Sequence, residues 1–316
     1  MKEIGGYLEI EYNKGSIFHE EALKLNCGRA CLEYLIEAYD IRKIWLPLFL
    51  CDSVFERCRN LGLEIGTYNI SADFSIIKPD LEDTDWLYLV NFYGLLRDRE
   101  IEKYKKWHKK IICDNAQAFF QQPVKGVPTI YTCRKFLGVP DGAFLYSEKV
   151  IDRELELDES RERMKHLLGR FERTATEYYH QYVDGEKIFS NEPIKRMSKL
   201  TENLLRGIDY DYVKRKRTEN WKELHQMLGN HNALKMEFVE GAFAYPFFHE
   251  KGSEIREALI KKQIYIPTLW SEVLSRCEET TVEYKLTSNL LPLPCDQRYG
   301  KTEMDYLSKC VLRLLS

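Results

Sequence analysis

Three short stretches of the sequence hold residue types that could carry out chemistry together. The first, Asn26-Cys-Gly-Arg-Ala-Cys-Leu, places Gly28 and Arg29 at the expected start of a helix. A helix start presents unpaired N–H groups and the positive end of a dipole, so these residues are candidates for holding a phosphate. Glycine also serves tight turns, so Gly28 taken alone fits a purely structural role equally well.

The second stretch, Ile111-Ile-Cys-Asp-Asn-Ala-Gln, is an apolar run that ends in a carboxylate. Ligands of open α/β sheets bind outside the carboxyl ends of the strands, so Asp114 and Gln117 are candidates for meeting one. The alternative for Asp114 is that it only caps the turn that follows the strand.

The third stretch, Tyr131-Thr-Cys-Arg-Lys-Phe-Leu-Gly, follows another expected strand and precedes a glycine-containing loop. Lys135 stands beside the positive charge of Arg134, and partial desolvation there would favour a neutral, nucleophilic amine. Most lysines are exposed and do no chemistry, which is the alternative for this one.

Considered together, the three stretches match the needs of one cofactor. Pyridoxal 5'-phosphate requires a phosphate cradle, an acid for its pyridinium nitrogen and a lysine amine for a Schiff base. Gly28, Asp114 and Lys135 supply these groups in that order along the chain.

Short apolar runs alternate with segments of helical period, which predicts an α/β fold with a mostly parallel central sheet flanked by helices. Apolar residues at i, i+3, i+4 and i+7 predict a helix over 31–39. The same reading gives further helices at 53–60, 99–109, 152–182, 211–228, 253–262 and 301–315. Strands are expected at 43–47, 64–68, 86–91, 110–114, 129–132, 143–146, 235–238 and 242–247. Residues 184–200 read as an exposed loop.

The C-terminal third of the chain, in which strands alternate with helices, predicts a second domain. Residues 1–205 would form the large cofactor-binding domain, and residues 206–316 a smaller C-terminal α+β domain.

The composition favours a small polar metabolite as partner. Lys and Arg number 47 against 50 Asp and Glu, without long runs of one sign, which excludes the electrostatic footprint of a nucleic-acid-binding protein. No apolar run reaches the roughly 20 residues of a membrane span, and the N-terminus lacks the pattern of a secretion signal, so a cytoplasmic protein is expected. The nine cysteines lack C-x-x-C spacing, so no metal site is expected and the thiols should be reduced.

Over nearly its whole length the sequence resembles the DegT-type (DegT/StrS) sugar aminotransferases, which have the pyridoxal phosphate-dependent transferase fold type I. Asn26 to Leu32 is similar to that family's S-G-T-x-A-L turn. Further similarities are Val90-Asn-Phe-Tyr-Gly to V-H-L-Y-G, Asp114-Asn-Ala-Gln to D-x-A-Q/H, Lys135-Phe-Leu-Gly with Asp141-Gly-Ala to K-N-x-G…D-G-G, and Leu291-Pro-Leu-Pro to the family's ending.

The resemblance implies roles for individual residues. Lys135 would form the Schiff base, Asp114 would pair with the ring nitrogen, and Gln117 would hydrogen-bond the phenolic oxygen of the ring. Thr132, a candidate for binding the cofactor, aligns across a two-residue deletion with a serine that usually stands a few residues before the lysine. Cys51 aligns with the aromatic residue that commonly stacks on the ring.

Several positions depart from the family pattern, and they define a divergent short subgroup. Cys27 and Arg29 stand where Ser and Thr usually support the phosphate, which leaves that contact to backbone N–H groups and the Arg29 guanidinium. Some relatives carry His at the lysine position and catalyse dehydrations, so Lys135 favours transamination.

The expected function is therefore amino transfer, with glutamate as donor and a nucleotide-linked keto-sugar as acceptor, in the biosynthesis of amino sugars for surface polysaccharides. Tyr93, Arg134 and Trp270 are candidates for contacting the substrate, and the resemblance implies a homodimer whose site is completed by the partner. One alternative is a catalytically inactive descendant that binds a nucleotide-sugar or a protein. A nucleotide-binding α/β enzyme is disfavoured because no G-x-G-x-x-G follows the first strand.

Overall fold

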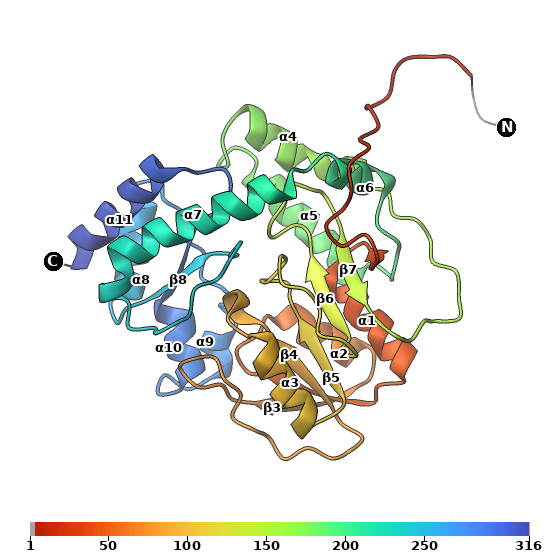
Figure 1. Cartoon of the computed structure of the whole chain (residues 1–316), viewed down its shortest axis with the longest axis horizontal. Coiled ribbons are helices and arrows are strands. Elements are labelled where there is room, and N and C mark those ends of the chain that lie inside the picture. Colours follow the sequence, from red (N-terminus) through yellow and green to blue (C-terminus); the bar gives the residue numbers. More distant parts are fainter. Residues whose placement is uncertain (1–3, 316) are drawn as a thin grey trace.

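A computed structural model describes residues 4–315 of the chain, and a seven-stranded sheet with helices around it forms the larger part of the molecule (Figure 1). The strand order is β1-β7-β6-β5-β4-β2-β3, and β7 alone runs antiparallel to its neighbours. The strands are β1 (Leu23–Leu25), β2 (Lys43–Pro47), β3 (Glu64–Tyr68), β4 (Trp86–Val90), β5 (Ile111–Asp114), β6 (Thr129–Thr132) and β7 (Ala143–Tyr146).

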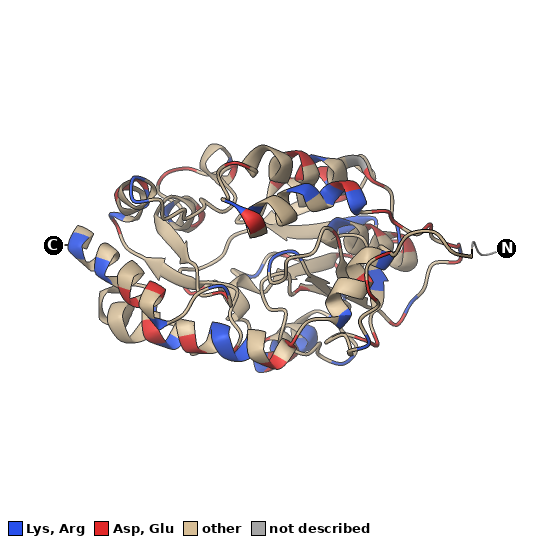
Figure 2. Cartoon of the chain, turned by 90° about the horizontal axis from the view of Figure 1, so that it is seen from above, with Lys and Arg blue, Asp and Glu red and all other residues tan. Residues whose placement is uncertain are grey.

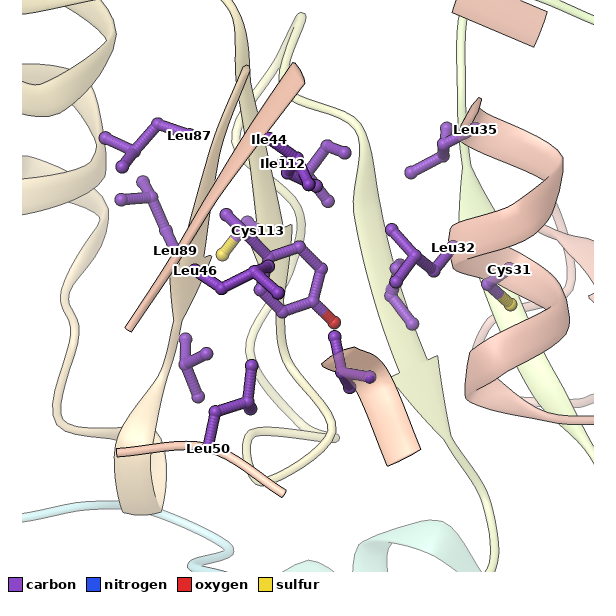
Figure 3. Close-up of a cluster of buried hydrophobic side chains, with 14 of the residues drawn as sticks. Cys31, Leu32, Leu35, Ile44, Leu46, Leu50, Leu87, Leu89, Ile112 and Cys113 are labelled. Atoms are coloured by element: carbon purple, nitrogen blue, oxygen red, sulfur yellow. The ribbon is translucent and has the colours of Figure 1, made fainter. Parts of the chain in front are cut away.

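The helices of this part follow the apolar spacing of the sequence. They are α1 (Gly28–Tyr39), α2 (Asp52–Asn60) and α3 (Asp98–Trp107), with a short 3-10 turn η1 (Phe92–Gly94). Figure 3 shows Leu32 and Leu35 of α1 directed toward the sheet. Burying these side chains excludes water from both surfaces and fixes α1 against the strands. The predicted helix and parallel sheet are confirmed here.

The predicted long helix over 152–182 is wrong. The chain instead forms η2 (Arg161–Met164), α4 (Lys165–Glu172) and α5 (Tyr179–Asn191). A Cβ atom on Gly169 would lie 2.2 Å from the Tyr178 ring, so the absent side chain leaves room for the chain to reverse between α4 and α5. The loop predicted over 184–200 is also partly wrong, because α5 runs through its first half and α6 (Lys199–Arg206) begins at its end.

A second, smaller unit follows α6. It contains α7 (Tyr210–Leu228), η3 (Gly229–His231), β8 (Tyr245–Phe248), α8 (Gly252–Ile260), α9 (Val273–Arg276), α10 (Val282–Asn289), β9 (Leu290–Leu293) and α11 (Lys301–Leu315). Strands β8 and β9 pair antiparallel and have a hydrophobic core of their own with α7, α8 and α11. We call α7 to α11 the C-terminal part. The strand predicted at 235–238 is wrong, because those residues form no regular element.

The two parts are joined by side chains as well as by the chain. Val273, Leu286 and Leu290 of the C-terminal part belong to the buried cluster of the large sheet. Arg276 at the end of α9 donates hydrogen bonds to the carbonyls of Leu48 (2.8 Å) and Leu50 (3.0 Å) in the loop after β2. The predicted boundary after residue 205 lies in the last turn of α6 and stays a prediction, since α9 and α10 pack on the larger unit.

Candidate active site

The sheet topology brings the ends of five strands to one edge. Strands β1, β2, β4, β5 and β6 all point the same way, so the residues that follow them gather there. These residues are Asn26 after β1, Cys51 in the loop after β2, Asn91 after β4, Asp114 at the end of β5 and Thr132 at the end of β6. This is the edge at which open α/β sheets bind their ligands.

Helix α1 opens onto this edge. Its N-cap Cys27 makes no side-chain capping bond, and a Cβ atom on Gly28 would meet only the Ile130 methyl at 3.9 Å. The packing of the protein therefore does not require a glycine there. Arg29 is half-buried and makes no ion pair or hydrogen bond within residues 4–315. Both features are typical of a helix start that receives an anion.

Asn26, the residue before the N-cap, is fully buried, yet neither its side-chain oxygen nor its nitrogen has a hydrogen-bond partner among the described residues. Its backbone is firmly held, since Gly142 N–H donates to its carbonyl at 2.6 Å. An orphaned buried amide costs about 1–3 kcal/mol, so it calls for an explanation. Asn26 was not predicted as a site residue, because the short strand β1 before it was not predicted either.

Asp114 lies at the end of β5 with a defined hydrogen-bond partner on each oxygen. Tyr88 donates its hydroxyl to Oδ2 at 2.9 Å, and the Ala116 backbone N–H donates to Oδ1 at 2.8 Å. Burial raises the pKa of the Tyr88 hydroxyl, and the Asp114 charge raises it further, so the phenol keeps its proton. The carboxylate is thus held in one orientation with lone pairs to spare on both oxygens.

Tyr88 was missed by the sequence analysis. It lies in the middle of the fully buried strand β4, where a tyrosine needs a partner for its hydroxyl. Cys51 lies close enough to Tyr88 for its charge to raise the same pKa. The Cys51 thiol itself is 3.3 Å from the Ser53 hydroxyl and is half-buried. Cys51 and Asp114 therefore flank one phenol.

Gln117 lies beyond Asp114, with its side chain fixed by a backbone group. The Tyr93 N–H donates to Gln117 Oε1 at 2.8 Å. Because the oxygen must face that donor, the free end of the amide is its NH2 group. A hydrogen-bond donor in this place suits an anionic oxygen on a ligand.

Lys135 stands in a tight turn that follows β6. The carbonyl of Cys133 accepts hydrogen bonds from the N–H groups of Phe136 (3.0 Å) and Leu137 (2.9 Å). The Lys135 side chain is exposed and makes no hydrogen bond or ion pair in the described part of the chain. Its ammonium group lies 5.9 Å from the centre of the Phe243 ring. The turn thus presents a free amine at the sheet edge.

The electrostatics of Cys31 show how close these groups are. Burial raises the pKa of this thiol in the first turn of α1, and charge on Cys27, Cys133 or Asp114 raises it further. Cys27 at the start of α1, Asp114 at the end of β5 and Cys133 at the start of the lysine turn therefore all lie near the Cys31 thiol. Thr132 is buried and, being two residues from Ile130, lies on the face of β6 that contacts α1.

The three predicted substrate residues are less exposed than Lys135. Arg134 forms an ion pair with Glu186 of α5, and its guanidinium lies 4.3 Å from the Phe189 ring centre. The Tyr93 side chain is fully buried, with a left-handed backbone at φ 56°. Trp270 is partly exposed, and its ring makes edge contacts with Phe49 and Phe92. Arg134 and Tyr93 would have to move to meet a substrate, so their assignment stays a prediction.

The Asp141-Gly142 pair has a structural task. Asp141 accepts hydrogen bonds from the Ser198 N–H (2.9 Å), the Ser198 hydroxyl (2.8 Å) and the Thr201 hydroxyl, and so anchors the start of α6. Gly142 has φ 110°, and a Cβ atom there would crowd Thr201 and Cys133. This pair fixes the loop that closes the lysine turn.

A cavity of about 420 Å³ reaches Gln117 from the side of α3 and α7. Its charged lining is internally neutralised, since Arg99 pairs with Glu237 at 2.7 Å and Lys214 with Glu240 at 2.7 Å. Figure 2 likewise shows positive and negative residues interspersed along the helices. The cavity therefore offers a ligand no uncompensated charge, unlike the start of α1.

Metal sites and membrane-spanning helices are both absent from the described residues. Residues 4–315 contain no group of three or more His, Cys, Asp or Glu side chains placed to hold a metal ion. In the same range, every helix is too short or too polar to cross a bilayer.

Comparison with known proteins gives matches among solved structures. The structure resembles a DegT DnrJ EryC1 StrS aminotransferase from Brucella abortus, with a TM-score of 0.64, 13% identity, and coverage of 93% of this chain and 85% of that one. For the sugar aminotransferase CalS13 from Micromonospora echinospora the TM-score is 0.61, with 12% identity and coverage of 93% and 88%. For NtdA from Bacillus subtilis with bound cofactor PMP it is 0.66, with 12% identity and coverage of 96% and 78%.

No family model matches the chain, and no curated protein sequence matches it. The structural likeness establishes the fold: the sheet and its helices are those of the aminotransferase structures, and the predicted fold class is confirmed.

Proposed function

We propose that the protein is a pyridoxal phosphate-dependent aminotransferase that transfers an amino group to a keto-sugar. One observation carries the proposal: the unpaired Lys135 amine stands at the same sheet edge as the fixed Asp114 carboxylate and the open start of α1. The fold is shared with sugar aminotransferases, and the similar NtdA structure holds PMP, the aminated form of this cofactor.

The residues present fit the cofactor's phosphate. The space beside Gly28, which a Cβ atom would fill without touching anything closer than 3.9 Å, lets an anion approach the first N–H groups of α1. Arg29 adds an unpaired guanidinium, and the orphaned amide of Asn26 lies directly before the helix. Thr132 supplies a hydroxyl from the face of β6 that contacts α1.

The residues also fit the ring. When bound, pyridoxal phosphate supplies an aldehyde that condenses with an amine and a ring that withdraws electrons once its nitrogen is protonated. Asp114 would hold that proton on the nitrogen, since an oriented, buried carboxylate favours a neighbouring positive charge. Gln117 would donate from its free NH2 group to the phenolic oxygen, and Cys51 would face the ring.

Lys135 would have two tasks. Its amine would hold the cofactor through the aldehyde. Released from the aldehyde, the same amine would take a proton from the donor's α-carbon as a general base and return a proton as a general acid. No acidic side chain of residues 4–315 forms an ion pair with Lys135, so the amine is available for both tasks.

We propose glutamate as donor and a nucleotide-linked keto-sugar as acceptor, within amino-sugar biosynthesis for surface polysaccharides. Because the chain carries a net charge of -3, an anionic sugar nucleotide would be attracted by local groups. Arg29 is available as it stands, whereas Arg134 becomes available only when it leaves Glu186. Trp270, partly exposed, is the aromatic residue placed to contact a sugar ring.

We also propose a homodimer. Helices α4 and α5 expose large apolar side chains, with Leu168 at 56%, Phe171 at 91% and Tyr179 at 60% exposed. Exposed apolar groups that are this close in sequence are typical of a surface that another chain covers. Helix α5 also holds Arg134 beside Lys135, so a partner on this face would adjoin the site. Analytical ultracentrifugation of the full chain tests this: a monomer at micromolar concentration would refute it.

The deciding experiment is spectroscopic. Purified protein given pyridoxal phosphate should develop a long-wavelength absorption band, and glutamate should then bleach it. Lys135→Ala should lose the band, whereas Lys125→Ala, a change at another exposed lysine, should keep it. Wild-type protein that forms no band would refute the proposal, and a band that glutamate never bleaches would favour a binding protein without aminotransferase activity.

A further inference from the structure

Arg217 of α7 is the largest fully buried polar side chain in the described chain, with 2% of its surface exposed. It lies between the two parts of the molecule and donates four hydrogen bonds. Its acceptors are the carbonyls of Ala242 (3.0 Å), Phe243 (3.2 Å) and Phe136 (3.0 Å) and the side-chain oxygen of Gln297 (2.9 Å). Burial lowers the pKa of this guanidinium.

No carboxylate forms an ion pair with Arg217 among residues 4–315. The nearby Asp296 gives both oxygens to Arg298, at 2.6 and 2.8 Å. Taking a guanidinium out of water costs several kcal/mol, and here all four direct hydrogen-bond acceptors that offset the cost are neutral carbonyl oxygens. A neutral apolar side chain would fill the space at lower cost, so simple packing does not account for an arginine.

The contact that stands out is the carbonyl of Phe136, the residue after Lys135. It accepts from Arg217 Nη2 and also from Gln297 Nε2 at 2.8 Å. The Arg217 guanidinium carbon further lies 4.6 Å from the centre of the Phe136 ring. Two side chains of the C-terminal part therefore hold one peptide group of the lysine turn.

The other end of that turn is held by the sheet. Cys133 N–H donates to the carbonyl of Gly142 at 3.0 Å, and Gly142 N–H donates to Asn26. The turn is thus fixed at its base by the large sheet and at its far side by Arg217 and Gln297. The Lys135 side chain is free, but the peptide that carries it is not.

We propose that Arg217 is a positioning residue for Lys135: with Gln297, it holds the Phe136 carbonyl and so sets the direction in which the lysine amine points. The inference rests on the proposed function for what the amine does. Arg217 also donates to the carbonyl of Phe243, and the ring of Phe243 lies 5.9 Å from the Lys135 ammonium. The same guanidinium therefore fixes both the turn and the aromatic residue beside the amine.

Hydrogen exchange of the full chain without cofactor tests the hold on the turn. In Arg217→Lys the amides of Phe136 and Leu137 should exchange about tenfold faster, because a single ammonium cannot replace the fork that reaches Phe136 and Gln297 together. The matched control is Arg256→Lys. Arg256 is also buried in the C-terminal part and donates to two carbonyls, those of Ser288 and Leu290 at 2.9 Å each, but does not contact the turn.

Arg256→Lys should leave exchange at residues 136 and 137 within about twofold of wild type, although its overall stability should fall as well. Equal effects of the two variants on the turn, or no effect of Arg217→Lys, would overturn the proposal. If Arg217→Lys does not fold, Gln297→Ala, which removes one of the two donors to Phe136, takes its place with a smaller expected increase.

A second readout separates this proposal from the proposed function. Pyridoxal phosphate should react with Lys135 about tenfold more slowly in Arg217→Lys than in Arg256→Lys, with the equilibrium affinity for the phosphate group, probed by inorganic phosphate, unchanged. Wild-type protein that never reacts would refute the proposed function, while the exchange experiment would still decide whether Arg217 holds the turn.

Discussion

Asn26 and Asn91 are both fully buried, both follow a strand of the large sheet, and both lie at its carboxyl edge, yet their surroundings differ completely. Asn91 donates to Asn115 Oδ1 at 3.0 Å and to Gln121 Oε1 at 2.6 Å, and accepts from the Leu96 N–H at 2.8 Å. Asn26 makes no side-chain hydrogen bond with any described residue.

The difference divides the sheet edge into two halves. Around Asn91, Asn115 and Gln121, the polar groups satisfy one another and hold the loops in place. Around Asn26, Gly28 and Lys135, polar groups and free space are left over. A protein tolerates unsatisfied groups where a ligand completes them, so the first half supports the site and the second half receives the ligand.

The largest loss of stability is expected when the hydrogen bonds around Asn91 are removed. Asn91→Leu removes three hydrogen bonds; it leaves Leu96 N–H and Gln121 Oε1 without partners, while Asn115 Oδ1 keeps only the Cys113 thiol. Each orphaned group costs about 1–3 kcal/mol, so the free energy of unfolding should fall by about 3–5 kcal/mol, measured by urea denaturation. A loss below about 1 kcal/mol would mean that the Asn91 network does not support the edge as argued.

The pH dependence of stability should reveal a second supporting group. His19 is buried against Tyr131; its Nε2–H donates to the Phe119 carbonyl at 2.8 Å, and its Nδ1 accepts from the Tyr146 hydroxyl at 3.1 Å. Burial lowers its pKa to about 4. The unfolded chain therefore binds a proton near pH 6.5 that the folded chain refuses until about pH 4, so stability should fall by about 3 kcal/mol as the pH drops across that window.

Urea denaturation between pH 7 and pH 4 measures this loss. His19→Phe removes the titrating group and should flatten the profile over that window, although its stability at pH 7 also changes through the lost contact with Phe119. An identical slope in wild type and variant would assign the pH dependence to other groups.

A smaller effect is expected from Tyr88→Phe, which removes the donor to Asp114. Hydrogen bonds to charged groups contribute about 1.5–3 kcal/mol, so the free energy of unfolding should fall by about 2 kcal/mol. The matched control, Tyr68→Phe, removes a bond to a neutral acceptor, the Tyr88 carbonyl at 2.7 Å, and should cost about 1 kcal/mol. If urea denaturation shows the same loss of unfolding free energy in both variants, the charge on Asp114 does not strengthen the hydrogen bond from Tyr88.

The sequence predicted most of the large sheet, because a buried parallel strand is a short apolar run with clear ends. It also predicted the strand ends that carry Asp114 and Lys135. The predicted helix over 152–182 is wrong because the chain reverses between α4 and α5, where the Tyr178 ring fills the space beside Gly169. A periodic sequence pattern does not reveal such a contact.

The supporting residues of the site were missed for a related reason. Tyr88 and Arg217 act through partners 26 and 81 positions away, Asp114 and Phe136. A tyrosine in an apolar strand and an arginine on a buried helix face show only that a partner must exist. Which partner it is depends on the sheet register and on how α7 packs, and neither can be read from local sequence.

The smallest change in the free energy of unfolding, and the only expected increase, should come from Asn26→Leu. The substitution replaces an orphaned amide by a branched apolar group of similar shape, so protein without ligand should become about 1 kcal/mol more stable in urea denaturation. If the amide serves an anion bound at the start of α1, the same variant should bind pyridoxal phosphate about tenfold more weakly, measured by equilibrium dialysis. A gain in stability with unchanged binding would show that Asn26 is a defect of packing and that the receiving half begins at Gly28. A loss of stability would show that the amide has a partner in solution, and the contrast with Asn91 would disappear.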